Sequence, residues 1–203
     1  SLTLRPELTA SVVRSYIQHN LGTLSPIQRL YYSGPLFRRE RPQKGRQRQF
    51  HQFGVEAFGS NNPEQDVEII AIAWKILSLC GLANDTTLNL NSIGSNECRN
   101  NYRTALKNYL SPYIKDFSKI SQHRFDTNPL RILDTKSEKE QEILNDAPKI
   151  SDYHNKTDST HFESLKEFLK DMGLPFCINH KLVRGLDYYT GTVFEFNSDN
   201  LGA

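Results

Sequence analysis

The spacing of apolar residues changes along this chain of 203 residues and predicts both strands and helices. Aromatic residues crowd segments 31–40 and 50–59, and the loop between them contains proline and glycine. This pattern predicts an antiparallel hairpin with a long connection. Residues 62–81 carry apolar side chains at helical spacing between an Asn-Pro start and a glycine stop, and they predict one buried helix. Further short strands are expected at residues 86–90, 176–179 and 189–196.

Local signals predict helices at the start and in the middle of the chain. Thr9 is expected to cap an N-terminal helix, because the apolar residues in 12–17 recur at helical spacing. Residues 94–174 have balanced charges and short helical patterns, and strands are expected before and after them. They therefore predict a helical insertion that interrupts a sheet. Two of its helices carry the pattern of a capping box, Ser137 with Glu140 and Thr160 with Glu163.

Together these elements predict an α+β fold with a mixed, mainly antiparallel sheet flanked by helices. The expected parts are a core at residues 1–93, the helical insertion at 94–174 and returning strands of the core at 175–203. Hydrophobic residues are 37% of the chain, against roughly 45–50% in ordinary globular domains. We therefore expect either a very polar module within the chain or a core completed by sequence outside it.

Composition argues against two classes of protein. The longest apolar run, residues 69–74, is far shorter than the roughly 18 residues that span a membrane, and no basic-then-apolar leader opens the chain. A membrane protein and a secreted precursor are therefore not expected. The three cysteines have no short spacing among them, which fits neither a disulfide framework nor a zinc knuckle. We expect a reducing, cytoplasmic location.

Positive charge is local. The formal net charge is +2, yet residues 1–60 hold nine Lys and Arg against three Asp and Glu. Within them, residues 38–48 carry six cations and one acid. Such a tract either meets phosphate or is a solvated loop. Arginine binds phosphate in a fork, so Arg38 and Arg46 are the best candidates in this tract.

The second strand of the hairpin separates polar from apolar side chains. A period of two places Phe53, Val55 and Ala57 on one face, which we expect to be core. The opposite face carries Gln52, Gly54 and Glu56. Arg38 and Glu40 are expected to share a face of the preceding strand, at the mouth of the basic loop. One arginine and two carboxylates gathered on one face of the sheet predict a binding site for a polar ligand. Phe50, just past the loop, either stacks on a flat base or packs in the core.

Near the end of the chain, residues 182–191 combine an arginine, two glycines and two tyrosines. Arg184 and Tyr189 reach one site only if the chain bends at Gly185. Tyr188 and Tyr189 point in opposite directions wherever strand geometry holds, so one of them is expected in the core. Other signals are weak: phosphate and dinucleotide loops, metal spacing and nucleophile arrangements are absent from the sequence. No metal site is expected, and His154 and His161 are expected to be surface residues.

At this point two stretches resemble a known family. Residues 37–56 resemble motif 2 of the class II aminoacyl-tRNA synthetases in its histidine-specific form. Residues 182–189 resemble the histidine-binding signature of the same family. The chain thus resembles the histidyl-tRNA synthetases over nearly its whole length.

The resemblance implies a role for each matching residue. Arg38 would hold the α-phosphate of ATP, Arg46 the γ-phosphate and Phe50 the adenine ring, with Glu40 near the adenine amino group. Arg184 would face the same α-phosphate opposite Arg38, which makes these two the catalytic arginines. The histidine-binding set would comprise Glu7, Thr9, Gln52, Glu56, Arg184, Tyr188 and Tyr189. Within that set Glu56 and Tyr189 would bond the imidazole nitrogens.

The resemblance also implies partners: ATP carrying Mg²⁺, L-histidine, the acceptor stem of tRNA(His) against the insertion, and a second copy in a homodimer. Leu8 stands where family members usually have glycine. Motif 1, motif 3 and the anticodon-binding domain are expected outside this chain, which we interpret as a fragment and not as active alone.

Two alternatives stay open. The first is a non-catalytic paralogue that senses histidine as a regulatory subunit of ATP phosphoribosyltransferase. Such paralogues tend to lose the insertion and the basic loop, and both are present here. The second is a bare RNA-binding module, which leaves Gln52, Glu56 and Arg184 unexplained.

Overall fold

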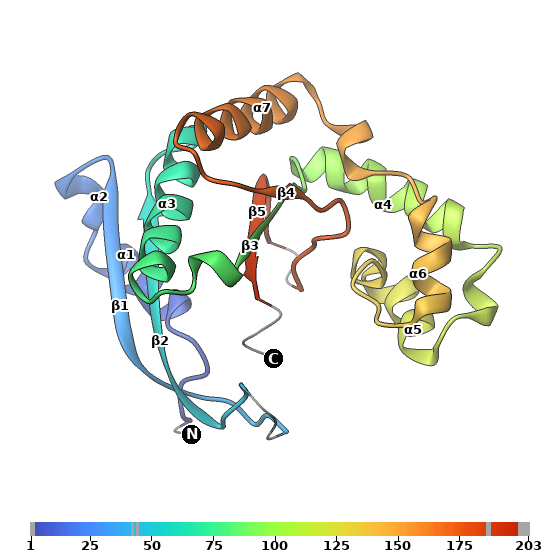
Figure 1. Cartoon of the computed structure of the whole chain (residues 1–203), viewed down its shortest axis with the longest axis horizontal. Helices are drawn as coiled ribbons and strands as arrows, with labels where there is room; N and C mark the ends of the chain where they lie inside the picture. The colour runs from blue at the N-terminus through green and yellow to red at the C-terminus, as the bar shows by residue number, and fades with distance from the viewer. Residues whose placement is uncertain (1–2, 42, 44, 186–187, 199–203) are drawn as a thin grey trace. The chain divides into compact units, whose positions relative to one another are not determined.

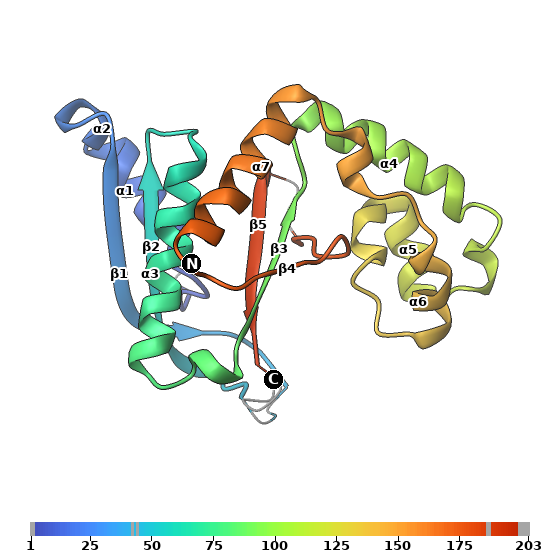
Figure 2. The same ribbon diagram turned by 45° about the horizontal axis from the view of Figure 1, so that its top comes forward.

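The computed structural model describes residues 3–41, 43, 45–185 and 188–198. It contains two compact units (Figures 1 and 2). The first holds the described residues up to Asp85 together with Ser198, and the second holds Thr86–Asn197. The division of the chain into a core at 1–93 and an insertion at 94–174 stays a prediction.

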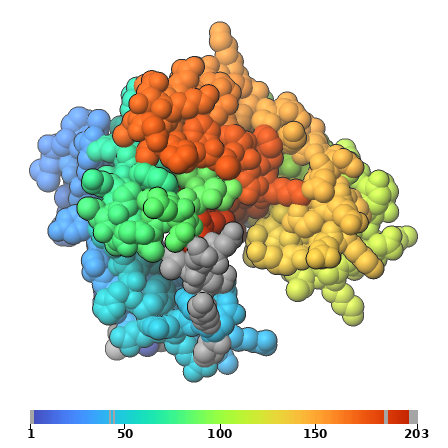
Figure 3. Space-filling model, in the orientation of Figure 1, coloured from blue at the N-terminus to red at the C-terminus, as the bar shows by residue number. Residues whose placement is uncertain are grey.

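A long antiparallel hairpin organises the first unit. Strand β1 (Gln28–Phe37) pairs with β2 (Gln49–Phe58) over its whole length, and Gly34 lies opposite Gln52. The hairpin was predicted, but β1 begins and ends three residues earlier than expected. Arg38 and Glu40 therefore follow the strand and do not share one of its faces. The segment that includes this connection lies at the molecular surface (Figure 3).

Three helices accompany the hairpin: α1 (Thr9–Gln18), α2 (Leu21–Leu24) and α3 (Pro63–Leu79), followed by the 3-10 turn η1 (Ala83–Asp85). Helix α3 confirms the predicted helix and its ends, with Pro63 in the first turn and Gly81 at φ +74° just after the end. It is less buried than predicted, because only Gln65, Val67 and Ile70 are buried. On β1, Arg29 forms an ion pair with Glu68 of α3 at 2.7 Å. Strand and helix are thus linked on the face of β1 that carries Arg29.

The start of α1 differs from the prediction. Thr9 is the first helical residue, and the preceding Leu8 makes no side-chain cap. The Glu7 carboxylate instead accepts a hydrogen bond from the backbone N–H of Ala10, with Oε2 at 3.0 Å. A carboxylate satisfies a free N–H at a helix start as a hydroxyl would. The Thr9 side chain is therefore available for other contacts.

The second unit confirms an insertion within a sheet. The order of its strands is β4 (Cys177–Ile178), β3 (Thr87–Ser92), β5 (Thr192–Asn197), where β3 runs parallel to β4 and antiparallel to β5. Between β3 and β4 the chain forms α4 (Asn96–Leu110), α5 (Lys119–Thr127), α6 (Glu138–Asn145) and α7 (Lys156–Asp171). Short 3-10 turns join them: η2 (Ile114–Asp116), η3 (Pro129–Ile132) and η4 (Ile150–Tyr153).

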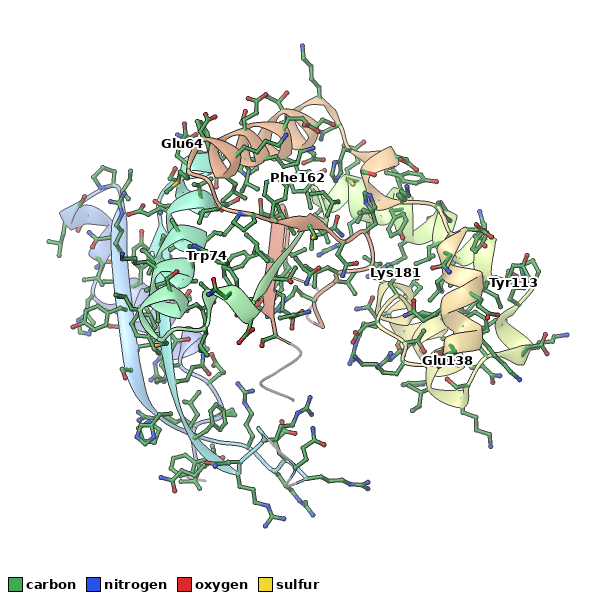
Figure 4. The ribbon with its side chains drawn as sticks, in the orientation of Figure 1. Glu64, Trp74, Tyr113, Glu138, Phe162 and Lys181 are labelled. Carbon is green, nitrogen blue, oxygen red and sulfur yellow. The ribbon has the colours of Figure 1, made fainter. Side chains whose placement is uncertain are left out.

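Apolar side chains from these helices form the core of the second unit. Its buried members include Tyr102, Leu106, Ile132 and Leu144. Helix α7 buries Phe162, which is labelled in Figure 4. None of the described helices is long and apolar enough to cross a membrane.

Both predicted capping boxes are wrong. Helix α7 begins at Lys156, so Thr160 lies inside it, and the box forms between Asn155 and Asp158. Ser137 precedes α6 but makes no side-chain cap. Its expected partner Glu140 is 3% exposed and points inward.

The inward carboxylate of Glu140 joins three segments of the insertion. It accepts hydrogen bonds from Ser118 N at 2.7 Å, Ser121 Oγ at 2.7 Å and Thr135 Oγ1 at 2.5 Å. Burial alone would raise the pKa of Glu140, but these hydrogen bonds outweigh it and hold the pKa below its ordinary value. The Glu140 carboxylate therefore stays ionised and acts as a structural hub that joins these segments.

Candidate active site

The loop of the hairpin encloses the residues that the resemblance assigns to ATP. A hollow of about 490 Å³ is lined by Arg38, Glu40, Gly45, Arg46, Gln47, Phe50 and His51. Arg38 follows β1 and Phe50 lies near the start of β2, so the pairing of the two strands brings them to one end of the hairpin. The four expected residues, Arg38, Glu40, Arg46 and Phe50, thus share one cavity.

The guanidinium of Arg38 is held on two sides. Its Nε donates to the carbonyl oxygen of Pro6 at 2.9 Å, and its Cζ lies 5.0 Å from the ring centroid of Phe50. The backbone N–H of Arg38 also donates to Arg48 O at 2.9 Å. Because Nε is engaged by a carbonyl, the two terminal nitrogens remain as the donors that a phosphate would meet.

Arg46 is held more loosely than Arg38. Its Nη1 lies 3.6 Å from Glu40 Oε2, and the two side chains are 52% and 35% exposed. An ion pair this exposed contributes little to stability. Gly45, at φ +80°, turns the chain beside the bridge between Gln43 and Arg46. Arg46 can therefore exchange Glu40 for an anionic ligand at small cost.

Four residues assigned to histidine lie on α1 and β2 or just before them. Gln52 Nε2 donates to the hydroxyl of Tyr32 at 3.0 Å, and the same hydroxyl lies 3.4 Å from Thr9 Oγ1. A hydrogen bond from Thr9 and the negative charge of Glu7 both act on the pKa of the nearby Glu56 carboxyl. The structure thus gathers Glu7, Thr9, Gln52 and Glu56 on one face of the hairpin.

Burial changes the protonation of Glu56. Desolvation raises the pKa of its carboxyl, the hydrogen bond from Thr9 lowers it, and the nearby Glu7 raises it further. The net result is a raised pKa. A carboxylate in this condition gains most from a cationic or donating ligand.

Sequence reasoning missed Tyr32. The strand register is what reveals it, because Tyr32 lies directly opposite Gly54 and so shares the face of Gln52 and Glu56. The expectation for the other face was wrong: Phe53 is 48% exposed and contacts Tyr31, which is 76% exposed. A two-stranded ribbon buries a face only where a helix covers it.

Leu8, which replaces the usual glycine of the family, adopts φ −123°. Only a positive φ would favour glycine on backbone grounds. A leucine is therefore accommodated here without backbone strain. The Glu7 carboxylate before it still reaches the start of α1.

Arg184, Tyr188 and Tyr189 belong to the second unit, while Leu186 and Asp187 of the same signature lie outside the described residues. Arg184 Cζ lies 5.6 Å from the ring centroid of Tyr189, so these two do come together. The tyrosine rings do not point apart: they stack at 4.9 Å, because this segment is not a strand. Tyr189 packs against the core and Tyr188 is 70% exposed.

The tyrosine segment is tied to the start of the insertion. Arg99 of α4 donates through Nη1 to the carbonyl oxygen of Tyr189. Gly191 N donates to Gly94 O, and Ile93 N donates to Gly191 O, both at 2.8 Å. The segment is therefore positioned by backbone contacts with the residues that flank α4.

Two histidines differ from expectation. His154 Nε2 lies 3.1 Å from Ser92 O, and its ring meets Phe162 edge-on. His161 Nε2 lies 3.5 Å from Thr192 Oγ1. Both are partly buried contacts of the second unit, not solvated surface residues. Among the residues that the structure describes, no group of three or more His, Cys, Asp and Glu side chains is placed to hold a metal ion.

Comparisons with known proteins identify relatives of this chain. A family model described as histidyl-tRNA synthetase matches residues 1–203. The protein named histidine–tRNA ligase from Cyanothece sp. is 54% identical over 100% of this chain and 47% of its own length. The protein of that name from Protochlamydia amoebophila is 50% identical over 100% of this chain and 48% of its length. The chain thus spans about half the length of these relatives.

Solved structures agree as well. The crystal structure of apo S. aureus histidyl-tRNA synthetase matches with a TM-score of 0.72 and 41% identity, over 95% of this chain and 44% of that one. A histidine–tRNA ligase subunit from Alicyclobacillus acidocaldarius shares the fold, with a TM-score of 0.53 and 21% identity. The family match along the whole sequence, together with relatives at half identity, establishes that this chain belongs to the histidyl-tRNA synthetase family.

Proposed function

We propose that the protein carrying this chain is a histidine–tRNA ligase. It activates histidine with ATP to histidyl-adenylate and pyrophosphate, and then transfers histidine to tRNA(His). One observation carries the proposal: the four residues proposed to bind ATP line one hollow at the end of the hairpin, and four residues proposed to bind histidine gather on one face of the same hairpin and at the adjoining start of α1. In this proposal ATP and histidine bind at neighbouring positions along the β1–β2 hairpin.

Formation of histidyl-adenylate requires that the two substrates be positioned and that negative charge on the phosphates be neutralised. A carboxylate oxygen of histidine attacks the α-phosphorus of ATP, a P–O bond forms, and the bond to pyrophosphate breaks. No protein nucleophile is needed. In this proposal Arg38 neutralises charge on the α-phosphate, with its terminal nitrogens aimed by Pro6 O. Mg²⁺ enters bound to ATP as part of that substrate, and Arg184 serves the same phosphate.

Selection of histidine falls to Glu56. Its carboxylate is partly desolvated and has one hydrogen bond, from Thr9, so a ligand without a donating ring nitrogen would leave it without a second donor. Tyr189 is proposed to meet the second ring nitrogen, with Tyr188 beside it. Arg46 would reach the γ-phosphate, Phe50 would stack on adenine and Glu40 would lie near the adenine amino group.

The remaining partners follow from the family. The insertion is proposed to contact the acceptor stem of tRNA(His), and the working unit is proposed to be a cytoplasmic homodimer. The relatives described above bear ligase names, which favours the ligase over a histidine-sensing regulatory paralogue. A bare RNA-binding module would not need the network that joins Gln52, Tyr32, Thr9 and Glu56.

Histidine-dependent exchange of pyrophosphate into ATP tests the activation step directly, and charging of tRNA(His) tests the transfer step. Both assays require the whole protein that carries this chain. Exchange that depends on histidine but not on other amino acids is expected. Exchange with no histidine dependence would contradict the proposed function.

A further inference from the structure

We propose that Tyr32 is a positioning residue for histidine recognition, and that its hydroxyl sets the donor and acceptor directions of Gln52 and Thr9. The inference rests on the proposed function and deepens it. Tyr32 is not among the residues that the family resemblance pointed to. What singles it out is its place between two of them.

The hydroxyl of Tyr32 is the central link of a four-residue chain. Gln52 Nε2 donates to it at 3.0 Å, and Thr9 Oγ1 lies 3.4 Å from it on the other side. Thr9 continues to the carboxylate of Glu56. The contacts join α1, β1 and β2, so no two neighbouring links come from the same element.

The direction of the hydrogen bonds follows from the Gln52 end of this chain. Gln52 Nε2 donates to the Tyr32 oxygen, and an amide N–H cannot accept. The single proton of the Tyr32 hydroxyl is therefore left to be donated to Thr9 Oγ1, 3.4 Å away. The protons of Gln52 and Tyr32 then point along the chain toward Thr9.

This order has a consequence for Gln52. Because its NH₂ group is turned to Tyr32, its carbonyl Oε1 is the end left to meet a ligand. A protonated α-amino group offers only donors and needs acceptors. Gln52 is thereby oriented for an ammonium group, and the residue that orients it is Tyr32.

Gly54 is what allows the tyrosine ring to lie there. A Cβ atom at Gly54 would stand 2.2 Å from Tyr32 Cζ and 2.3 Å from its hydroxyl oxygen. Such distances are far inside van der Waals contact, so the ring would have to move. Gly54 has no positive φ, so close packing of the ring is the reason for glycine at this position.

The neighbouring tyrosine supplies a matched control. Tyr31 lies on the opposite face of β1, is 76% exposed and contacts Phe53, which lies on the same face of the hairpin as Tyr31. Tyr31→Phe and Tyr32→Phe each remove one hydroxyl and keep the ring. Only the second interrupts the chain to Glu56.

The test measures pyrophosphate exchange by the whole protein with each variant. Tyr32→Phe is expected to raise KM for histidine about three- to tenfold, the worth of one lost hydrogen bond, and to leave KM for ATP unchanged. Imidazolepropionate, which lacks the α-amino group, should inhibit wild type and Tyr32→Phe equally. Tyr31→Phe should match wild type in all three measurements.

A second pair of variants separates positioning from general instability. Gly54→Ala should raise KM for histidine in the wild type, but add little in a Tyr32→Ala background, where no ring is displaced. An unchanged KM for histidine in Tyr32→Phe would overturn the inference, as would an equal rise in KM for ATP. If the wild type itself shows no histidine-dependent exchange, the proposed function fails first.

Discussion

The guanidinium of Arg38 lies over the ring of Phe50, with 5.0 Å between Cζ and the ring centroid. The two residues flank the connection of the hairpin and line the same hollow. A cation held on an aromatic face gains about 0.5–2 kcal/mol and keeps its edge free. An arginine in this position can bind phosphate with its edge while the ring beside it receives a base.

Replacement of Arg38 by lysine tests this arrangement. Lysine keeps the charge, but it cannot both donate to Pro6 O and present a fork to phosphate. We expect the rate of pyrophosphate exchange to fall about a hundredfold or more. Arg29→Lys is the control, because Arg29 pairs with Glu68 and lies away from the hollow. Equal rates for both variants would contradict the role of Arg38.

Glu56→Gln is expected to abolish histidine activation and yet stabilise the fold at neutral pH. The folded-state pKa of Glu56 is raised above its ordinary 4.5, mainly by desolvation. Between the ordinary and the raised value the folded state binds more protons, so stability falls as pH rises, and the penalty persists above that window. Glutamine removes the penalty.

Thermal unfolding at two pH values checks the sign of this effect. The gain in Tm of Glu56→Gln should be present at pH 7 and vanish below pH 4, where the carboxyl is neutral in both states. Glu64→Gln, on the exposed first turn of α3, should show no gain. A lower Tm at pH 7 would mean that the Glu56 carboxylate stabilises the fold.

Glu140 should show the opposite dependence on pH. Its folded-state pKa is lowered, because the hydrogen bonds from Thr135, Ser118 and Ser121 outweigh burial. Its contribution to stability is therefore complete above the ordinary value of 4.5 and is lost as pH falls through the folded pKa. Glu140→Gln should cost about 2–3 kcal/mol at pH 7, since buried donors lose a charged acceptor.

Denaturant unfolding at pH 7 measures the loss. The control is Glu138→Gln, an exposed acid on the same helix, which should change the free energy of unfolding by less than about 0.5 kcal/mol. A Glu140 variant as stable as the Glu138 variant would show that the carboxylate is not a structural hub.

The N-terminus of α7 distinguishes the observed cap from the predicted one. Asn155→Ala should cost about 1 kcal/mol, because Asn155 Oδ1 accepts from Asp158 N at 2.8 Å. Thr160→Ala should cost almost nothing, since Thr160 is an exposed residue inside the helix. Chemical denaturation of the two variants side by side measures the difference. A larger loss of stability in Thr160→Ala than in Asn155→Ala would support the predicted helix start at Thr160 and contradict the observed one.

The sequence by itself was sufficient where the signals are local or where residue types at fixed spacing carry the chemistry. Helix α3 was predictable because an Asn-Pro start, an apolar repeat and Gly81 all lie within one short segment. The stretch from Arg38 to Glu56 pointed to the family, because its resemblance to motif 2 rests on residue types at fixed spacing. The sheet interrupted by an insertion followed from strand patterns on either side of it.

Tertiary structure decided which side chains meet. Tyr32 joins the site only because the register places it across from Gly54, and register depends on a partner strand 22 positions away. Glu140 matched a local cap, yet donors from two other segments drew it inward, since a buried carboxylate needs several of them. Phe53 followed a core pattern but stays partly exposed, because burial requires a neighbouring element that its own strand does not encode. Contacts between segments distant in sequence, and the burial they create, set the polarity of the proposed histidine site.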